Sequence, residues 1–299
     1  MIQLLLEEMI ISKEIKEASK LTKEEWKEYT KTVWHIANTS HAIHPAIFPE
    51  EIPKRLIKLF SFVEETILDP FGGVGTTSFV SSELNRKSIY IDQNGDYLNI
   101  AKNRLEESKV DLVSHILKHG DSRDMSFIDS NNVDLIITSP PYWDKADYGG
   151  NGSNIGSIDN YNKFFEEIRP VFDECFRVLR PGRKLCLVTA NVNQNTNHGL
   201  LTFPLSTDFA NLLREIGFVM INEVIWSKDK TGGKWGSYGA QRPIFGSYPY
   251  PPNFLFKNVH EYVLIFAKPN AKAKKGGSVK NYEGLMNLPE SLHSKIFED

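Results

Sequence analysis

Short apolar segments alternate with longer amphipathic segments between residues 65 and 226, and this alternation constrains the fold more than any other feature. Strands are predicted at 65–69, 87–92, 114–121, 133–139, 184–190 and 218–226. Helices are predicted at 76–84, 96–108, 161–179 and 206–217. Strands that alternate with helices in this way predict an α/β fold with a doubly wound, mostly parallel sheet.

Length and composition set only broad limits on what the chain does. Its 299 residues are enough for one large α/β domain with an appendage, or for two small domains. No apolar run reaches membrane-spanning length, and the first residues carry acids where a secretory signal carries bases, so we expect a cytoplasmic protein. Cys175 and Cys186 lack metal-ligand or disulfide spacing, so we expect both in the core and predict no metal site.

The segment LDPFGGVGTT, residues 68–77, joins the first predicted strand to the first helix. Gly72, Gly73 and Gly75 allow a tight turn and let a ligand approach the backbone closely, as a nucleotide-binding turn requires. The glycine spacing differs from the dinucleotide fingerprint, and Asp69 would repel a pyrophosphate although it suits a cationic ligand. No Gly-Lys-Ser/Thr follows the glycines, which excludes a P-loop nucleoside triphosphatase.

Two more acids follow the next strands. Asp92 ends the second strand, where folds of this kind accept hydrogen bonds from ribose hydroxyls, and Asp121 ends the third. Ligands of open α/β sheets bind beyond the carboxyl ends of the strands, so we expect both acids and Asp69 around one cleft. A single acid after a strand is often only a helix cap. Three acids beside a glycine loop fit a positively charged nucleoside such as S-adenosyl-L-methionine.

The fourth strand runs into the sequence TSPPYW at residues 138–143. Pro140 and Pro141 have a fixed φ and no N–H, so they end sheet pairing and hold the loop in a stiff, extended form. A stiff loop at the carboxyl end of a strand is well placed for chemistry. Taken alone, the segment also fits an ordinary proline-rich turn.

With both loops in view, the chain resembles the amino-group DNA methyltransferases, which methylate N4 of cytosine or N6 of adenine. The resemblance covers residues 41–268: DPFGGVGTT is similar to the cofactor loop of that family, and TSPPY to its catalytic tetrapeptide. The segments RVLRPG (177–182) and HEYVLIFAKP (260–269) are similar to later landmarks. The resemblance implies a Rossmann-like class I methyltransferase fold, S-adenosyl-L-methionine as cofactor, and double-stranded DNA with a flipped target base as substrate.

The segment HPAIFPEEIPKRLIKLFS, residues 44–61, resembles the part of that family which precedes the cofactor loop and closes over the methionine part of the cofactor. The order of cofactor segment, catalytic loop and C-terminal region matches the arrangement called gamma, whereas a serine tetrapeptide is more often met with the catalytic loop first. The cofactor-binding residues expected from the loop, the strand ends and the resemblance are His44, Pro45, Phe48, Asp69, Pro70, Phe71, Gly73, Gly75, Thr76, Thr77, Asp92 and Asp121.

The composition of the catalytic loop suits direct methyl transfer to an amine. An exocyclic amino nitrogen is a poor nucleophile because its lone pair is delocalised into the base, and acceptors for its N–H bonds would aim that lone pair at the methyl group. Ser139 Oγ and the Pro140 carbonyl, on a loop stiffened by Pro141, are the expected acceptors. Tyr142 and Trp143 are expected to stack on the flipped base, through the ring of Tyr142 rather than its hydroxyl. No Pro-Cys pair is present, which argues against cytosine-C5 methylation.

The net charge of −3 does not indicate a nucleic-acid binder, so any basic surface must be local. From Glu223 to Lys280 there are ten bases against three acids, interleaved with aromatics and glycines. We predict that the loop at 144–157 is mobile and closes the site. The expected DNA contacts, besides Trp143, are Lys230, Lys234 and Arg242.

These features predict four regions. They are an N-terminal helical arm (1–40), a catalytic domain (41–227 and 259–269), a DNA-recognition insertion (228–258) and a C-terminal tail (270–299). The helical spacing of Trp26, Tyr29 and Val33 is the basis for the arm.

A site-specific cytosine-N4 DNA methyltransferase is the favoured function, because the tetrapeptide begins with serine where adenine enzymes more often have aspartate or asparagine. The alternatives are adenine-N6 methylation, a catalytically silent DNA-binding subunit, and an RNA or protein-glutamine methyltransferase. The resemblance also raises a restriction-modification role, a cognate endonuclease and a homodimer as hypotheses.

Overall fold

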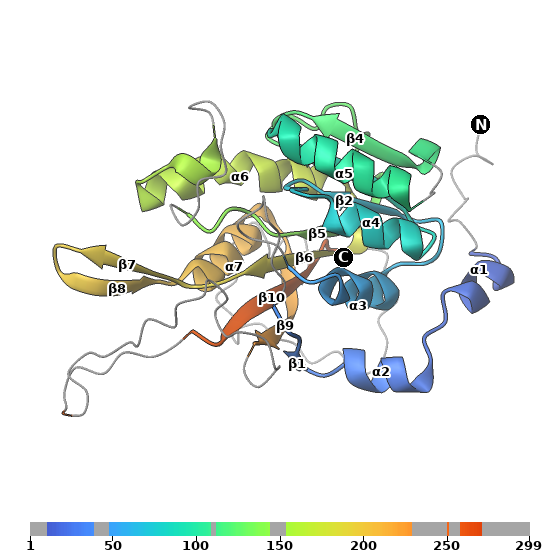
Figure 1. The fold of residues 1–299 in the computed structure, drawn as a ribbon, viewed down its shortest axis with the longest axis horizontal. Coiled ribbons are helices and arrows are strands. Elements are labelled where there is room, and N and C mark those ends of the chain that lie inside the picture. Colours follow the sequence, from blue (N-terminus) through green and yellow to red (C-terminus); the bar gives the residue numbers. More distant parts are fainter. Residues whose placement is uncertain are drawn as a thin grey trace.

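The computed structural model describes residues 11–38, 48–108, 112–143, 154–228, 250 and 258–270. Within these residues an eight-stranded sheet forms the centre of the molecule, in the order β1-β9-β10-β6-β5-β2-β3-β4 (Figure 1). The strands are β1 (Val33–His35), β2 (Thr66–Asp69), β3 (Lys87–Asp92), β4 (His115–His119), β5 (Val133–Thr138), β6 (Leu179–Thr189), β9 (Val219–Ser227) and β10 (His260–Ala267). All of these run parallel to one another except β10, which is antiparallel to both of its neighbours.

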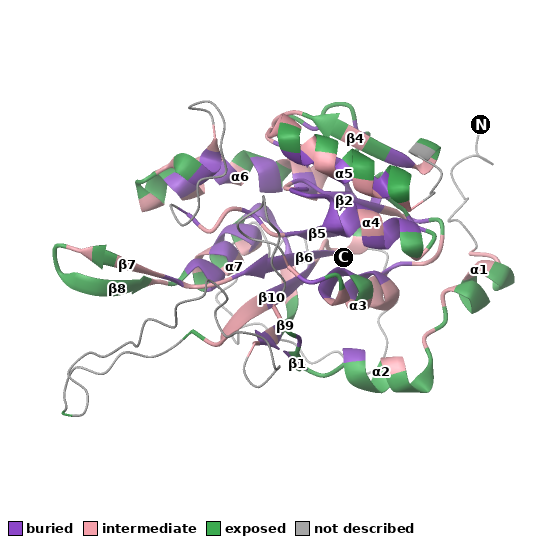
Figure 2. Ribbon diagram, viewed as in Figure 1, coloured by how far each residue is buried: buried purple, intermediate pink, exposed green. Residues whose placement is uncertain are grey.

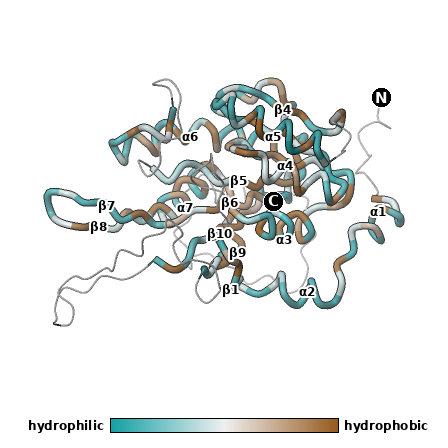
Figure 3. Tube along the Cα trace, viewed as in Figure 1, coloured by the Kyte–Doolittle hydropathy of each residue, from teal (hydrophilic) through white to brown (hydrophobic). Residues whose placement is uncertain are grey.

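Helices cover both faces of the sheet, as predicted for a doubly wound fold. The helices are α1 (Lys13–Ala18), α2 (Lys23–Tyr29), α3 (Glu51–Phe60), α4 (Thr76–Glu83), α5 (Gly95–Glu107), α6 (Tyr161–Val178) and α7 (Leu205–Ile216). On one face, α3 and α4 pack on β2, β5 and β6, and α5 packs beside α4. On the other face, α6 and α7 form an aromatic-rich core with the same sheet. Figures 2 and 3 show the central strands as buried and hydrophobic.

Each central strand serves both cores because successive side chains point to opposite faces of a sheet. Ile67 and Leu68 are adjacent and fully buried, yet Ile67 packs in the cluster with α3 and Leu68 in the cluster with α6 and α7. All six residues of β5 are buried, and four of them are apolar, which is typical of a strand that is covered on both faces. Cys175 and Cys186 lie in these two cores, as expected.

The direction of winding reverses between β2 and β5. From β2 the chain passes through α4 to β3 and through α5 to β4 on one side, and from β5 it passes through α6 to β6 on the other side. Such a reversal leaves a crevice at the carboxyl ends of the two strands, which is where open α/β sheets bind ligands. The loops after β2 and β5 are LDPFGGVGTT and TSPPYW, the two segments that the sequence singles out.

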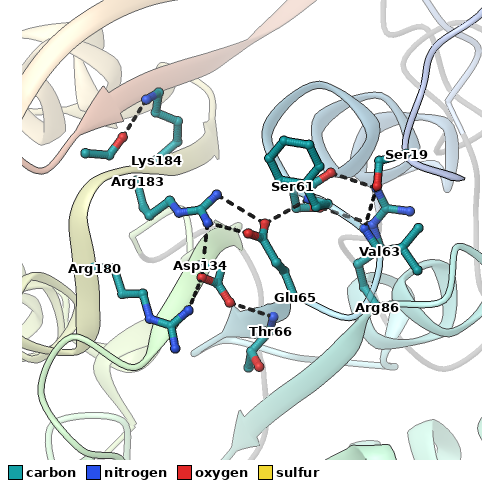
Figure 4. Close-up of polar contacts among 12 residues, drawn as sticks. Ser19, Ser61, Val63, Glu65, Thr66, Arg86, Asp134, Arg180, Arg183 and Lys184 are labelled. Atoms are coloured by element: carbon teal, nitrogen blue, oxygen red, sulfur yellow. Dashed lines mark hydrogen bonds and ion pairs between the residues drawn. The ribbon is translucent and has the colours of Figure 1, made fainter. Parts of the chain in front are cut away.

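The opposite, amino-terminal edge of β2 and β5 holds a buried ionic network (Figure 4). Asp134 Oδ2 accepts a hydrogen bond of 3.0 Å from the Thr66 backbone, and its Oδ1 pairs with Arg180 at 2.5 Å. Arg183 donates to Glu65, with one contact at 3.1 Å, and lies 3.5 Å from Asp134. Because this network joins the start of β2 to β5 and β6 on the far side from the crevice, its role is structural.

The N-terminal region differs in part from the predicted helical arm. α1 and α2 are short helices, and α2 begins with a capping box between Thr22 and Glu25. Val33, which the helical spacing placed in the arm, instead lies in β1 and pairs with Ile225 of β9. Pairing with the sheet edge and burial of Trp34 favour the strand over the local helical pattern.

Two further differences concern β6 and the chain that follows it. β6 begins at Leu179, earlier than the predicted 184. A hairpin of β7 (Val192–Thr196) and β8 (Gly199–Phe203), which the apolar pattern does not indicate, forms a separate two-stranded sheet. β7 is mostly polar, and β8 is a short strand whose Leu200 and Leu201 are exposed, so neither has the long buried apolar pattern from which the other strands were predicted. No helix within the described ranges is long and apolar enough to cross a membrane.

Candidate active site

A hydrogen bond joins the two candidate loops at the crevice. Thr138 Oγ1, at the end of β5, donates to Asp69 Oδ1, at the end of β2, over 2.9 Å. The same carboxylate accepts from Thr77 Oγ1 at 2.6 Å and from the Phe71 backbone N–H at 3.1 Å. Asp69 therefore ties the catalytic loop, the cofactor loop and the start of α4 into one unit.

Asp69 is 2% exposed, so its carboxylate does not face a ligand in the crevice. Burial raises the pKa of this carboxyl to about 6, although Thr77, Thr138 and the Phe71 N–H oppose the rise. This buried position does not match the predicted role of Asp69 as a direct partner for a cationic ligand. Asp69 organises the loops from beneath.

The glycines of the cofactor loop allow close packing within the protein. A Cβ at Gly72 would lie 2.1 Å from the ring of Tyr90, and a Cβ at Gly75 would lie 2.6 Å from Cβ of Ala101 in α5. Gly75 also has φ +78°, a left-handed conformation that other residues rarely adopt. At both positions the close neighbour is another part of the protein, whereas a ligand was expected to approach the backbone there.

Gly73 and Asp92 connect the cofactor loop to the end of β3. The Gly73 N–H donates to Asp92 Oδ2 at 2.8 Å, and the Gly73 carbonyl accepts from the Tyr90 hydroxyl at 2.7 Å. Asp92 Oδ1 accepts from the Asn94 N–H at 2.8 Å. Each carboxylate oxygen has more than one acceptor site, so Asp92 retains capacity to accept from a ligand hydroxyl. Burial raises the pKa of Asp92, and its side chain remains half-buried at the crevice.

Asp121 lies beyond the next strand, β4, and is bound by an arginine. Arg123 donates to both oxygens of Asp121, at 3.0 and 2.6 Å to Oδ2, and also pairs with Glu167 of α6 at 2.6 Å. Partial burial raises the pKa of Asp121, but the bonds from Arg123 outweigh it and hold that pKa below its ordinary value. The neighbouring Ser122 hydroxyl donates to the Pro70 carbonyl at 2.5 Å, which anchors this turn to the cofactor loop.

The other predicted cofactor residues differ in exposure. Phe48 and Phe71 are half-buried and partly cover the two cores. Pro70, Thr76 and Thr77 are buried, and Thr76 Oγ1 accepts from Arg104 at 3.3 Å. His44 and Pro45 lie outside the described residues.

The catalytic loop leaves β5 with its polar groups near the surface. Ser139, Pro141 and Tyr142 are half-buried, whereas Pro140 is buried. Ser139 Oγ donates to the Tyr142 hydroxyl at 3.3 Å. The serine and the tyrosine of the tetrapeptide are therefore joined by their hydroxyls, a relationship that their sequence spacing does not reveal.

Glu261 and Lys228 complete this end of the crevice and were not predicted as site residues. The Tyr142 hydroxyl donates to Glu261 Oε2 at 3.0 Å, and Lys228 pairs with Oε1 of the same carboxylate. Lys228 Nζ also lies 4.4 Å from the centroid of the Trp226 ring. In the sequence, Glu261 is visible only as an acid at the start of an apolar segment. The antiparallel direction of β10 is what brings this end of the strand to the crevice.

Trp143 was predicted to contact DNA, and the structure places it in the protein core instead. Its side chain is 6% exposed, and its indole N–H donates to the Asp159 carbonyl at 3.1 Å. Its ring meets the ring of Tyr161 edge-on at 5.1 Å and lies 4.5 Å from the ring of Phe203. With these contacts its role is to anchor the end of the catalytic loop.

The other predicted DNA contacts, Lys230, Lys234 and Arg242, lie outside the described residues, as does most of the predicted recognition insertion. So do residues 144–153 of the predicted closing loop and residues 271–299 of the predicted tail. The described end of the closing loop, Ile155–Ser157, forms a short 3₁₀ turn in which Ile155 is buried. Among the described residues, no cluster of His, Cys, Asp and Glu side chains has the arrangement of a metal site.

Comparison with known proteins gives a family match over most of the chain. Residues 5–103 and 133–295 match the family model N6_N4_Mtase, described as DNA methylase. The interval between them contains β4 and the turn of Asp121, and the matched parts include both loops of the crevice.

Among curated proteins, the type II methyltransferase M.MjaI of Methanocaldococcus jannaschii is 44% identical over 177 residues, which is 52% of this chain and 56% of that protein. The type II beta methyltransferase M.BslI of a Bacillus strain is 24% identical over 78% of this chain and 30% of its own length. The chain thus spans about half or less of the length of these relatives.

Two solved structures illustrate the structural likeness. TTHA0409 of Thermus thermophilus, named as an inferred DNA modification methylase and solved with S-adenosyl-L-methionine, is 29% identical over 54% of each chain, with a TM-score of 0.36. TrmN of Thermus thermophilus is 16% identical over 76% of this chain and 51% of its own, with a TM-score of 0.47. The strand order and winding described above define the fold independently of both.

Proposed function

The chain belongs to the N6/N4 DNA methylase family, and from this premise we propose that it transfers a methyl group from S-adenosyl-L-methionine to the exocyclic amino group of a base in DNA. We favour N4 of cytosine as the acceptor because the tetrapeptide begins with Ser139. The observation that carries the proposal is the 2.9 Å bond between Thr138 and Asp69, which joins the TSPPYW loop to the glycine loop at the switch point of the sheet.

The crevice has the chemistry that this cofactor needs. Asp92 is a half-buried carboxylate with remaining acceptor capacity at the end of β3, suited to ribose hydroxyls. Phe71 offers a partly buried apolar surface in the same loop. The carboxylate of Asp92 suits a cationic nucleoside better than a phosphorylated one, because it would repel a phosphate. When bound there, S-adenosyl-L-methionine supplies an electrophilic methyl group on a positively charged sulfur.

The residues of the catalytic loop would prepare the amine. Ser139 Oγ and the Pro140 carbonyl accept the two N–H bonds of the amino group, which favours a pyramidal nitrogen with an available lone pair. The Tyr142 ring stacks on the flipped base and holds it in register. As the new bond between the nitrogen and the methyl carbon forms, the bond between that carbon and the cofactor sulfur would break, and the sulfur would keep the electron pair and leave as a neutral thioether. The methylated nitrogen would then lose one proton to water, since Ser139 Oγ and the Pro140 carbonyl accept hydrogen bonds but are too weakly basic to hold a proton. The loop thus acts by orientation and electrostatics, without a covalent intermediate.

The proposed contact with DNA rests mainly on the sequence. Lys230, Lys234 and Arg242 would contact phosphates or base edges, since they lie in the basic, aromatic-rich segment between β9 and β10. The names of the relatives also support a role in a restriction-modification system, in which a companion endonuclease cuts unmethylated sites.

The test is to identify the product. The full chain is incubated with the cofactor and unmethylated genomic DNA, and the DNA is digested to nucleosides and analysed by mass spectrometry. N4-methylcytosine is the expected product, and N6-methyladenine would establish the alternative specificity. A chain that binds DNA and leaves every base unmodified would be the catalytically silent subunit instead.

A further inference from the structure

We propose that Glu261 is a positioning residue that sets the direction of the hydrogen bonds in the catalytic loop, so that Ser139 presents an acceptor to the target amine. The inference rests on the proposed function, because the amine is its substrate. Its structural basis is a chain of contacts from Lys228 through Glu261 and Tyr142 to Ser139.

The chemistry of the groups orients this chain. A carboxylate paired with a lysine can only accept hydrogen bonds, so the Tyr142 hydroxyl must donate its proton to Glu261 over the observed 3.0 Å. The lone pairs of the Tyr142 oxygen can then accept from Ser139 Oγ, which lies 3.3 Å away. With its own proton directed to Tyr142, Ser139 Oγ turns its lone pairs outward.

This direction matters because an amino group needs an acceptor. A serine hydroxyl rotates and can present either its proton or its lone pairs. If it presented the proton, it would oppose the N–H bonds of the base. A hydrogen bond to an ionised group is roughly twice as strong as a neutral one, so Glu261 biases the whole chain toward the productive direction. Each bond in the chain also polarises the next, which makes Ser139 Oγ a better acceptor.

The topology explains why Glu261 can reach the loop. β10 is antiparallel to its neighbours, so its first residues lie at the edge where the parallel strands end. Glu261 pairs in register with Trp226, and the Lys228 N–H donates to the Val259 carbonyl at 2.8 Å, which holds the two strand ends together. The side chains of Lys228 and Glu261 are 16% and 15% exposed.

Burying such a pair brings little net stability, because the cost of removing both charges from water offsets their attraction. Stabilisation of the fold therefore does not explain why Lys228 and Glu261 form an ion pair at this place. A role in orienting Tyr142 and Ser139 does explain the pair, and it separates two functions within Tyr142. The ring stacks on the base, and the hydroxyl transmits the orientation from Glu261.

The test is a double-mutant cycle on single-turnover methylation, with cofactor affinity measured by calorimetry for every variant. Glu261→Ala and Tyr142→Phe should each lower the rate by roughly ten- to a hundredfold, the range for losing a hydrogen bond to a charged group. Cofactor affinity should stay within about twofold of wild type, as expected when only transition-state stabilisation is lost. The double variant should be no slower than the slower single variant. Glu261→Gln should recover part of the rate, because its amide oxygen still accepts from Tyr142.

Glu223→Ala is the matched control, since Glu223 is an exposed carboxylate on the neighbouring β9, and it should methylate at the wild-type rate. Rate losses that add in the double variant, or a wild-type rate in Glu261→Ala, would overturn the proposal. Should Glu261→Ala fail to fold, a wild-type rate in Tyr142→Phe overturns it equally. If wild type itself methylates no DNA, the proposed function fails first, and the inference fails with it.

Discussion

The carboxylate of Asp69 and the hydroxyl of Thr138 form a buried hydrogen bond of 2.9 Å between the ends of β2 and β5. Asp69 also accepts hydrogen bonds from the Thr77 hydroxyl and the Phe71 backbone N–H, so the geometry of both loops depends on one side chain. The acids at the strand ends therefore have different roles. Asp69 supports the two loops from the interior, and we propose that Asp92 faces the cofactor.

The raised pKa of Asp69 predicts a specific pH dependence of stability. Since burial raises the folded-state pKa from 3.8 to about 6, the contribution of this group is fully present below pH 4 and is lost as the pH rises through 6. Relative to Asp69→Asn, the free energy of unfolding of wild type should fall by up to about 3 kcal/mol over that range. Urea unfolding of both proteins at several pH values measures this difference. Parallel pH profiles would contradict the assignment.

Asp92 should act on cofactor binding rather than on folding. Asp92→Ala removes the carboxylate at the end of β3, so it should weaken S-adenosyl-L-methionine binding by roughly tenfold or more, the effect of a hydrogen bond to a charged group. Isothermal titration calorimetry measures the affinity. Asp96→Ala is the matched control, because Asp96 is an exposed acid in the first turn of α5, and its affinity should be unchanged. Equal affinities in wild type and Asp92→Ala would exclude the role given to Asp92.

The ionic network at the other edge of the sheet should affect stability alone. Asp134→Ala leaves Arg180 without its carboxylate partner and the Thr66 N–H without its acceptor, while Arg183 keeps its pair with Glu65, so it should destabilise the protein by about 1–3 kcal/mol. Cofactor affinity of the folded fraction should not change. Chemical denaturation measures the loss, with the exposed Asp129→Ala as control. A loss below about 1 kcal/mol would mean that the network is not structural.

The basic segment between β9 and β10 should carry the salt dependence of DNA binding. Neutralising Lys230, Lys234 and Arg242 together should weaken binding and flatten the plot of log affinity against log salt, because fewer counterions are released from the phosphates. Fluorescence anisotropy with a labelled duplex at several salt concentrations measures both effects. An unchanged slope would place the DNA surface elsewhere, in the 144–157 loop or the N-terminal arm.

The central strands β2, β3 and β5 could be predicted from the sequence because they are largely buried on both faces and therefore mostly apolar. β3 and β5 have nearly the predicted bounds, and α6 is the predicted crossover helix. The exposed hairpin of β7 and β8 and the short β1 carry no such pattern, because the hairpin is not buried and the pairing of β1 depends on its tertiary contact with β9.

The loops of the site were also predictable, but the partners of their side chains were not. Asp69 and Asp92 look equivalent in sequence, yet one is enclosed by two threonines and the other is half-exposed. Trp143 looks like part of the catalytic motif and is a core residue. Glu261 is distant in sequence from Tyr142 and meets it only because β10 runs against the other strands.

Transfer of a labelled methyl group tests the central claim most directly. Wild type and Ser139→Ala are incubated with duplex DNA and S-adenosyl-L-methionine that carries a deuterated methyl group, and the nucleosides are analysed by mass spectrometry after a single turnover. We predict labelled N4-methylcytosine with wild type, and a much slower appearance with Ser139→Ala at an unchanged cofactor affinity. Equal rates in the two proteins, or no labelled base with wild type, would contradict the proposed role of the TSPPYW loop.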